Sequence, residues 1–94
     1  MFPQADQYTL ADLQGAADIV EEIDANNSYL GFFDPSKDLT DEQKKAQPVC
    51  SILHVVRNQA AYPRTTEMKW AGGSFMYSYI WNNRAGATYK FKKF

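Results

Sequence analysis

The sequence predicts a two-layer α+β domain in which two N-terminal helices pack on a C-terminal three-stranded antiparallel meander. Residues 65–94 alternate between aromatic and polar side chains, and two earlier segments repeat apolar residues at helical spacing. Burying one large apolar side chain is worth about 1.5–3 kcal/mol. The aromatic side of the sheet therefore needs a cover, and the helices supply that second layer.

The first predicted helix covers residues 9–25. Thr9 is placed to cap it, and Asp12 in the first turn suits the helix dipole. Asn26-Asn27 is a plausible end. Its apolar stripe consists of Leu10, Leu13, Ala16, Ala17, Val20 and Ile23.

The next segment, residues 28–39, has no regular period. Tyr29–Phe33 is too short to distinguish an edge strand from an apolar loop that packs down. Asp34-Pro35-Ser36 is typical of a turn.

The second predicted helix begins at Thr40, with Gln43 at the capping-box position. At Pro48 the helix either kinks or ends and a new one begins, because proline removes a helical hydrogen bond. Tyr62-Pro63 ends it. The apolar stripe after Pro48 consists of Val49, Ile52, Leu53, Val56 and Ala60.

The sheet is predicted from two turns. Gly72-Gly73 lies between alternating runs and suits a two-residue hairpin turn, since both central positions need positive φ. A second turn is expected within residues 82–86. One face then carries the aromatic side chains, which point beneath the helices, and the other carries the lysines, which face water. The aromatic face consists of Thr66, Met68, Trp70, Phe75, Tyr77, Tyr79, Trp81, Tyr89 and Phe91.

Length and composition indicate one ordinary domain, residues 1–94. The chain is 45% hydrophobic and 22% charged. No apolar run approaches the roughly 20 residues of a membrane span, and the N-terminus lacks the basic and apolar regions of a signal peptide. A single cysteine excludes an internal disulfide framework, so we expect a cytoplasmic chain without membrane association.

Charge is divided unevenly along the chain. Residues 1–47 contain ten acidic and three basic side chains, a net charge of −7, and residues 48–94 contain one acidic and seven basic, a net charge of +6. Such asymmetry indicates either a partner surface or two halves that neutralise each other within one fold.

The residues that could carry chemistry are few. Cys50 and His54 are four apart on the predicted second helix, but the chain has no other Cys or His. A structural zinc site usually needs four such ligands, and a cysteine nucleophile needs an orienting group and an oxyanion hole. A buried, inert cysteine is the ordinary interpretation.

Adjacent carboxylates do not supply catalytic machinery either. Glu21-Glu22 and Asp41-Glu42 neighbour each other on helix surfaces instead of converging across a cleft. Gly72-Gly73 lacks the spacing and lysine of a phosphate-binding loop. We therefore expect no enzyme activity, no cofactor and no metal.

The favoured hypothesis is a small protein-binding or assembly module, whose partner is another protein or further copies of the chain. Phe32 and Phe33 are adjacent, so in an extended segment they point to opposite sides and one of them is a candidate contact residue; the alternative is that both are buried. The acidic first helix is a candidate surface for a basic partner, through Asp18, Glu21 and Glu22. Accessory and inhibitory proteins of viruses or mobile elements often have this profile.

The alternative is nucleic-acid binding by the C-terminal sheet. Cations and aromatic rings together can bind single strands by stacking and phosphate contacts. Against this, the sheet lysines alternate away from the aromatic face, and the chain is not basic overall. The candidate residues are Lys69, Arg84, Lys90, Lys92 and Lys93.

Overall fold

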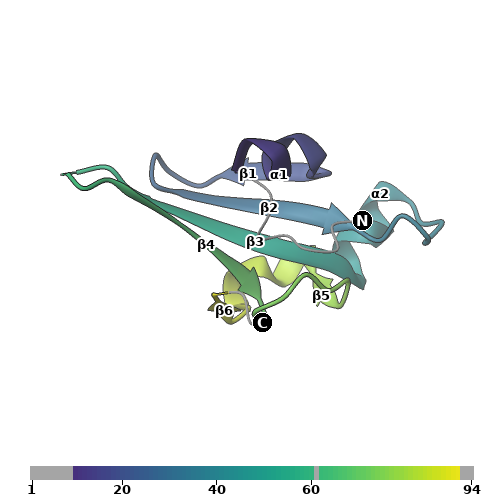
Figure 1. Ribbon diagram of the computed structural model, residues 1–94. Helices are drawn as coiled ribbons and strands as arrows, with labels where there is room; N and C mark the ends of the chain where they lie inside the picture. The colour runs from purple at the N-terminus through teal and green to yellow at the C-terminus, as the bar shows by residue number, and fades with distance from the viewer. Residues whose placement is uncertain (1–9, 61, 92–94) are drawn as a thin grey trace.

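The chain forms one antiparallel sheet around a long central strand in a computed structural model (Figure 1). The structure describes residues 10–60 and 62–91. The strands lie in the order β1-β2-β3-β4-β6, and β5 pairs with the beginning of β3. Along the chain the elements are α1 (Leu10–Ala16), β1 (Ile19–Glu22), β2 (Asn27–Phe33), α2 (Asp41–Ala46), β3 (Pro48–Asn58), β4 (Thr65–Ala71), β5 (Tyr79–Ile80), the 3₁₀ helix η2 (Trp81–Gly86) and β6 (Tyr89–Lys90).

The predicted layer of two helices on a three-stranded meander is therefore wrong. The six strands form a single sheet, and the helices are short. Among the described residues, no helix has the length and apolar character needed to cross a membrane.

The largest correction concerns the segment after Pro48, which is the central strand β3 instead of a helix. Ile52 and Leu53 are neighbours that point to opposite sides of the sheet, and both are 0% exposed. A strand covered on both faces has a nearly continuous apolar run, and such a run also contains residues at helical spacing. Pro48 takes the first position of the strand, where proline is tolerated.

The first predicted helix, residues 9–25, is divided into α1 and the strand β1. α1 ends at Ala16 after seven residues. β-branched side chains lose rotamer freedom in a helix and fit a pleated strand. The second half of the predicted helix contains three of them: Ile19, Val20 and Ile23.

A tight turn joins β1 to β2 where the sequence predicts the end of a helix. The Asp24 carboxylate accepts hydrogen bonds from the Asn26 backbone N–H at 2.8 Å and from the Asn27 side chain at 3.0 Å. The two asparagines therefore connect strands. The predicted cap Thr9 lies outside the described residues.

The undecided segment Tyr29–Phe33 belongs to β2, which pairs with β1 on one side and β3 on the other. Gly31 lies in the middle of this strand. A Cβ atom there would come within 2.6 Å of Ile19 and 2.8 Å of the Trp81 ring. Only glycine lets Trp81 pack this closely over β2.

Two local predictions between β2 and β3 are confirmed. Asp34 forms the predicted turn, with its carboxylate accepting from the Ser36 backbone N–H at 2.9 Å. Thr40 and Gln43 form a complete capping box at the start of α2. Short-range chemistry sets both features.

In the C-terminal third, the strand β4 and the glycine turn follow the prediction, and the rest of the predicted meander does not. Gly72 and Gly73 have φ angles of 72° and 85°, as the predicted turn requires. After this turn the chain leaves β4, and residues 75–78 form no strand. The helix η2 replaces the predicted second turn, and β6 returns to pair with β4 at Trp70 and Ala71.

The aromatic side chains are divided between the two faces of the sheet, so the predicted single aromatic face is wrong. The α1 face is the side of the sheet over which α1 packs. Its core contains Leu13, Leu30, Phe32, Leu53, Val55 and Trp70, with Phe75 and Tyr77 beside them. On the opposite, η2 face the core contains Tyr29, Cys50, Ile52, Ala71 and Trp81, with Tyr79 and Tyr89 beside them. Phe91 is 56% exposed.

Candidate functional site

The end of β2 brings together three of the five predicted protein-binding residues. Asp18, Phe32 and Phe33 line an open groove of about 500 Å³, which we call the β2-end groove. The chain positions that supply its wall are far apart in sequence. The other lining residues are Ala16, Asp34, Pro35, Lys44, Phe75 and Tyr77.

A smaller hollow of about 320 Å³ lies next to the groove and shares Asp18, Phe33 and Lys44 with it. Its remaining lining residues are Ile19, Asp41 and Lys45. The groove includes Phe32 of the α1 face and the hollow includes Ile19 of the η2 face. The two depressions therefore flank the end of β2.

Asp18 completes the sheet at this end. β1 begins only at Ile19, opposite Gly31, so the last residues of β2 extend past it. The Asp18 carboxylate accepts the Phe33 backbone N–H at 2.8 Å, where a strand carbonyl would otherwise bind it. Asp18 is itself exposed, so its carboxylate is both a structural acceptor and part of the groove rim.

Asp34 is the second carboxylate of the groove. Hydrogen bonds from the Ser36 hydroxyl, at 2.7 Å, and from the Ser36 backbone N–H lower the pKa of Asp34, and the nearby Lys37 adds to the effect. The carboxylate is therefore ionised at neutral pH. Of the described residues that line the groove, Asp18 and Asp34 are acidic and Lys44 is basic.

The wall of the groove is aromatic. Phe32 is 3% exposed and packs against Trp70 and Phe75, with ring centroids 5.6 and 5.5 Å away. Phe75 in turn contacts Tyr77 edge to face at 5.2 Å. Edge-to-face ring pairs hold such a wall in a fixed arrangement.

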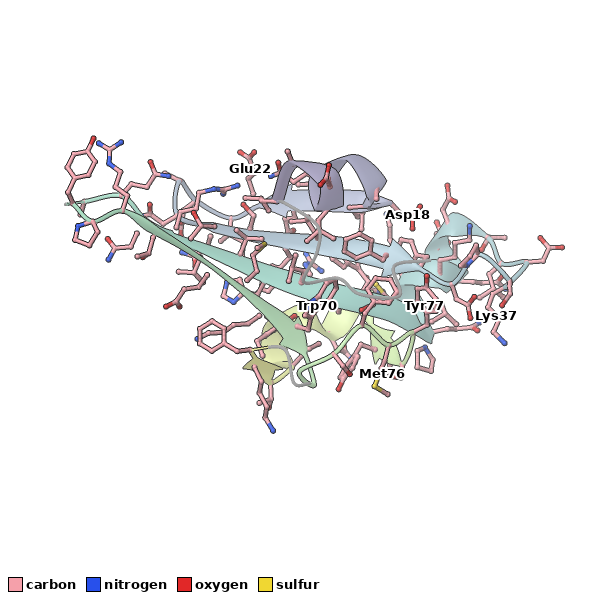
Figure 2. All side chains as sticks on the ribbon, viewed as in Figure 1. Asp18, Glu22, Lys37, Trp70, Met76 and Tyr77 are labelled. Atoms are coloured by element: carbon pink, nitrogen blue, oxygen red, sulfur yellow. The ribbon has the colours of Figure 1, made fainter. Side chains whose placement is uncertain are left out.

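Tyr77 is half-buried on this wall. Burial raises the pKa of Tyr77, and the carboxylates of Asp34 and Asp18 raise it further, so its hydroxyl stays protonated. Figure 2 shows Asp18 and Tyr77 toward the end of the sheet that carries α2, with Trp70 nearer the middle. The groove thus offers an apolar wall, a neutral hydroxyl and a net acidic rim.

The other two predicted protein-binding residues, Glu21 and Glu22, lie on β1 outside the groove. Glu22 is exposed. Glu21 binds Arg84, a predicted nucleic-acid residue, through two hydrogen bonds of 2.7 and 2.5 Å. The ion pair lowers the pKa of Glu21, chiefly through the side-chain hydrogen bond.

Arg84 is the centre of a structural cluster on the η2 face. Its guanidinium lies 4.6 Å from the centre of the Trp81 ring and donates to the Trp81 carbonyl at 3.1 Å. The Tyr89 hydroxyl donates to the Arg84 carbonyl at 2.7 Å. Arg84 therefore links β1 to η2 and β6, and its side chain has a structural role.

Of the other basic candidates, the two that the structure describes, Lys69 and Lys90, lie on opposite faces of the sheet. Lys69 lies on the η2 face, 3.7 Å from Glu67 and 4.8 Å from the centre of the Phe91 ring. Lys90 is paired with Trp70 in the sheet and so belongs to the α1 face. Lys92 and Lys93 lie outside the described residues.

Cys50 and His54 are not neighbours, because in a strand four residues span about 13 Å. Cys50 is 0% exposed, and burial raises the pKa of its thiol to about 12. His54 stacks on Tyr29 at 4.7 Å, and burial together with Lys69 lowers its pKa. In residues 10–60 and 62–91, no group of three or more His, Cys, Asp or Glu side chains could hold a metal ion.

The sequence analysis did not name four of the groove residues as protein-binding residues. Asp34 was recognisable only as a turn residue, and Lys44 only as part of a helix surface. Phe75 and Tyr77 were expected to lie under helices. No family model, no curated protein and no solved structure matches this chain.

Proposed function

We propose that this protein is a non-catalytic binding module that holds a segment of another protein in the β2-end groove. The observation that carries the proposal is the composition of the groove: a fixed aromatic wall beside the carboxylates of Asp18 and Asp34. An apolar side chain fits such a wall, and an Arg or Lys side chain fits the rim. The segment is therefore basic and partly apolar.

Lys44 reduces the negative charge of the groove but does not cancel it, so the preference for a basic segment remains. Lys44 is half-buried on α2 and faces both depressions. Among the described residues that line the groove, two carboxylates against one ammonium give a net negative charge, which attracts a cationic segment and repels an acidic one.

The test uses a random peptide-display library selected on the immobilised full chain. We expect enriched peptides to share a Lys or Arg next to an apolar residue. The variant D18N/D34N should weaken their binding about tenfold, a loss of about 1.4 kcal/mol, measured by titration calorimetry. Asn keeps an oxygen that can accept the Phe33 N–H at position 18 and the Ser36 N–H at position 34, so the groove keeps its shape.

The matched control is D38N/E42Q, which changes the charge equally at two exposed residues that do not line the groove. We expect its Kd to stay within about twofold of the wild type. If no peptide is enriched, or if enriched peptides bind D18N/D34N as tightly as the wild type, the groove is not the binding site.

A further inference from the structure

The outer edge of β1, which no strand of the described residues covers, lies next to the β2-end groove. The Ile23 N–H donates to the Asn27 carbonyl at 2.9 Å, which makes these two residues a hydrogen-bonded pair. Such pairs recur at every second residue of an antiparallel ladder, so Glu21 and Ile19 also bond to β2. The N–H and C=O groups of Val20 and Glu22 therefore point away from the sheet. Among the described residues, no strand pairs with this side of β1.

The side chains of this edge are also open. Val20 is 44% exposed and Ile23 is 53% exposed. Proteins commonly protect such edges with lysine, proline or a covering loop. β1 contains neither lysine nor proline.

The charge along the outer edge of β1 indicates which kind of strand can pair with it. Asp18 precedes β1, Glu22 lies on it, and Asp24 follows it, and all three are exposed. The one basic side chain that forms an ion pair with β1 among the described residues, Arg84, is bound to Glu21. Pairing with β1 of a second copy would bring like charges together, which is unfavourable across strands. A basic strand meets the edge without this repulsion.

The edge leads directly into the groove. Asp18 and Ile19 stand at the start of β1, and both line the depressions at the end of β2. A strand laid along β1 and continued past Asp18 would therefore enter the groove in an extended conformation. The Glu21–Arg84 pair holds β1 in place before any partner arrives, which lowers the cost of ordering it.

We propose that the segment held by this protein adds to β1 as a further strand of the sheet, with Lys or Arg at alternate positions, and that its continuation fills the β2-end groove. The inference rests on the proposed function. The backbone of Val20 and Glu22 supplies hydrogen bonds, and Asp18 and Glu22 select the basic side chains.

The test replaces Val20 with proline. V20P removes an N–H that points away from β2, so it leaves the β1–β2 hydrogen bonds intact while blocking strand addition. With a peptide selected on the wild type, we expect V20P to raise Kd about tenfold. V20A, which keeps the N–H, should change Kd less than about twofold.

A scan of N-methylated peptides on the wild-type protein keeps the test valid if V20P fails to fold. Strand addition predicts that methylation weakens binding at every second peptide residue, those whose N–H faces β1. If neither V20P nor alternate N-methylation weakens binding while D18N/D34N does, strand addition is wrong and the groove remains the site. If D18N/D34N also has no effect, both proposals are wrong.

Discussion

β3 and β1 are both strands in segments that the sequence predicts as helix, but they are held in different ways. β3 has sheet neighbours along both edges and is covered on both faces, so Cys50, Ile52, Leu53 and Val55 are all 0% exposed. Within residues 10–60 and 62–91, β1 pairs with β2 alone, and half of its side chains are exposed. The central strand is held by burial, whereas the edge strand depends on its ladder and on one ion pair.

The difference has a functional meaning. A strand with neighbours along both edges has few backbone groups left for a partner, because its N–H and C=O groups bond to the adjacent strands. Only an edge strand can accept another chain. The stability of the domain and its proposed binding therefore belong to separate strands of one sheet.

Shortening a side chain in β3 should have the largest effect. We expect I52A to lower the free energy of unfolding by about 2–5 kcal/mol, because it leaves a cavity between β3 and the Trp81 cluster. The equivalent change on β1, V20A, should stay within about 0.5 kcal/mol, since Val20 is 44% exposed. Urea unfolding followed by fluorescence measures both. Equal losses in the two variants would mean that β3 is not the buried strand.

Removing the ion pair of β1 should have a smaller and pH-dependent effect. In the folded state the pKa of Glu21 is lowered by Arg84, so the carboxylate stabilises the fold above its unfolded pKa of about 4.5, and this stabilisation is lost as pH falls through the lowered folded value. The two side chains are 38% and 24% exposed, which limits the gain to about 0.3–1 kcal/mol.

We therefore expect E21Q to destabilise the protein by this amount at pH 7 and by less at pH 3, measured by urea unfolding at both values. E22Q, on the same strand and in no ion pair within the described residues, is the matched control and should have little effect at pH 7. An E21Q variant as stable as the wild type at pH 7 would show that the pair does not hold β1.

The parts of the fold that were predictable from the sequence are those fixed by a few consecutive residues. The Asp34 turn, the Thr40–Gln43 capping box and the positive φ angles at Gly72 and Gly73 are all of this kind. The strand β4 also follows from its local alternation. Each depends on backbone geometry that neighbouring side chains impose.

The remaining features depend on contacts between distant residues. Val49, Ile52, Leu53 and Val56 fit a helical stripe as well as a buried strand, and only the sheet neighbours decide between them. The Glu21–Arg84 pair joins residues 63 positions apart, so no local pattern indicates it.

The same limit applies to the candidate site: single residues were named from the sequence, but their grouping was not. Asp18 was named for its charge on a predicted acidic helix, and Phe32 and Phe33 because adjacent residues of an extended segment point to opposite sides. Their grouping with Phe75 and Tyr77 required the path that the chain takes after Gly73.

Residue-resolved amide hydrogen exchange, with and without a selected basic peptide, tests the proposed division of roles most directly. In the free protein we expect the Leu53 and Val55 amides to exchange slowly and those of Val20 and Glu22 to exchange fast. The bound peptide should slow Val20 and Glu22 selectively. Fast exchange along β3, or unchanged exchange at Val20 and Glu22 with the peptide bound, would contradict the proposed roles of the two strands.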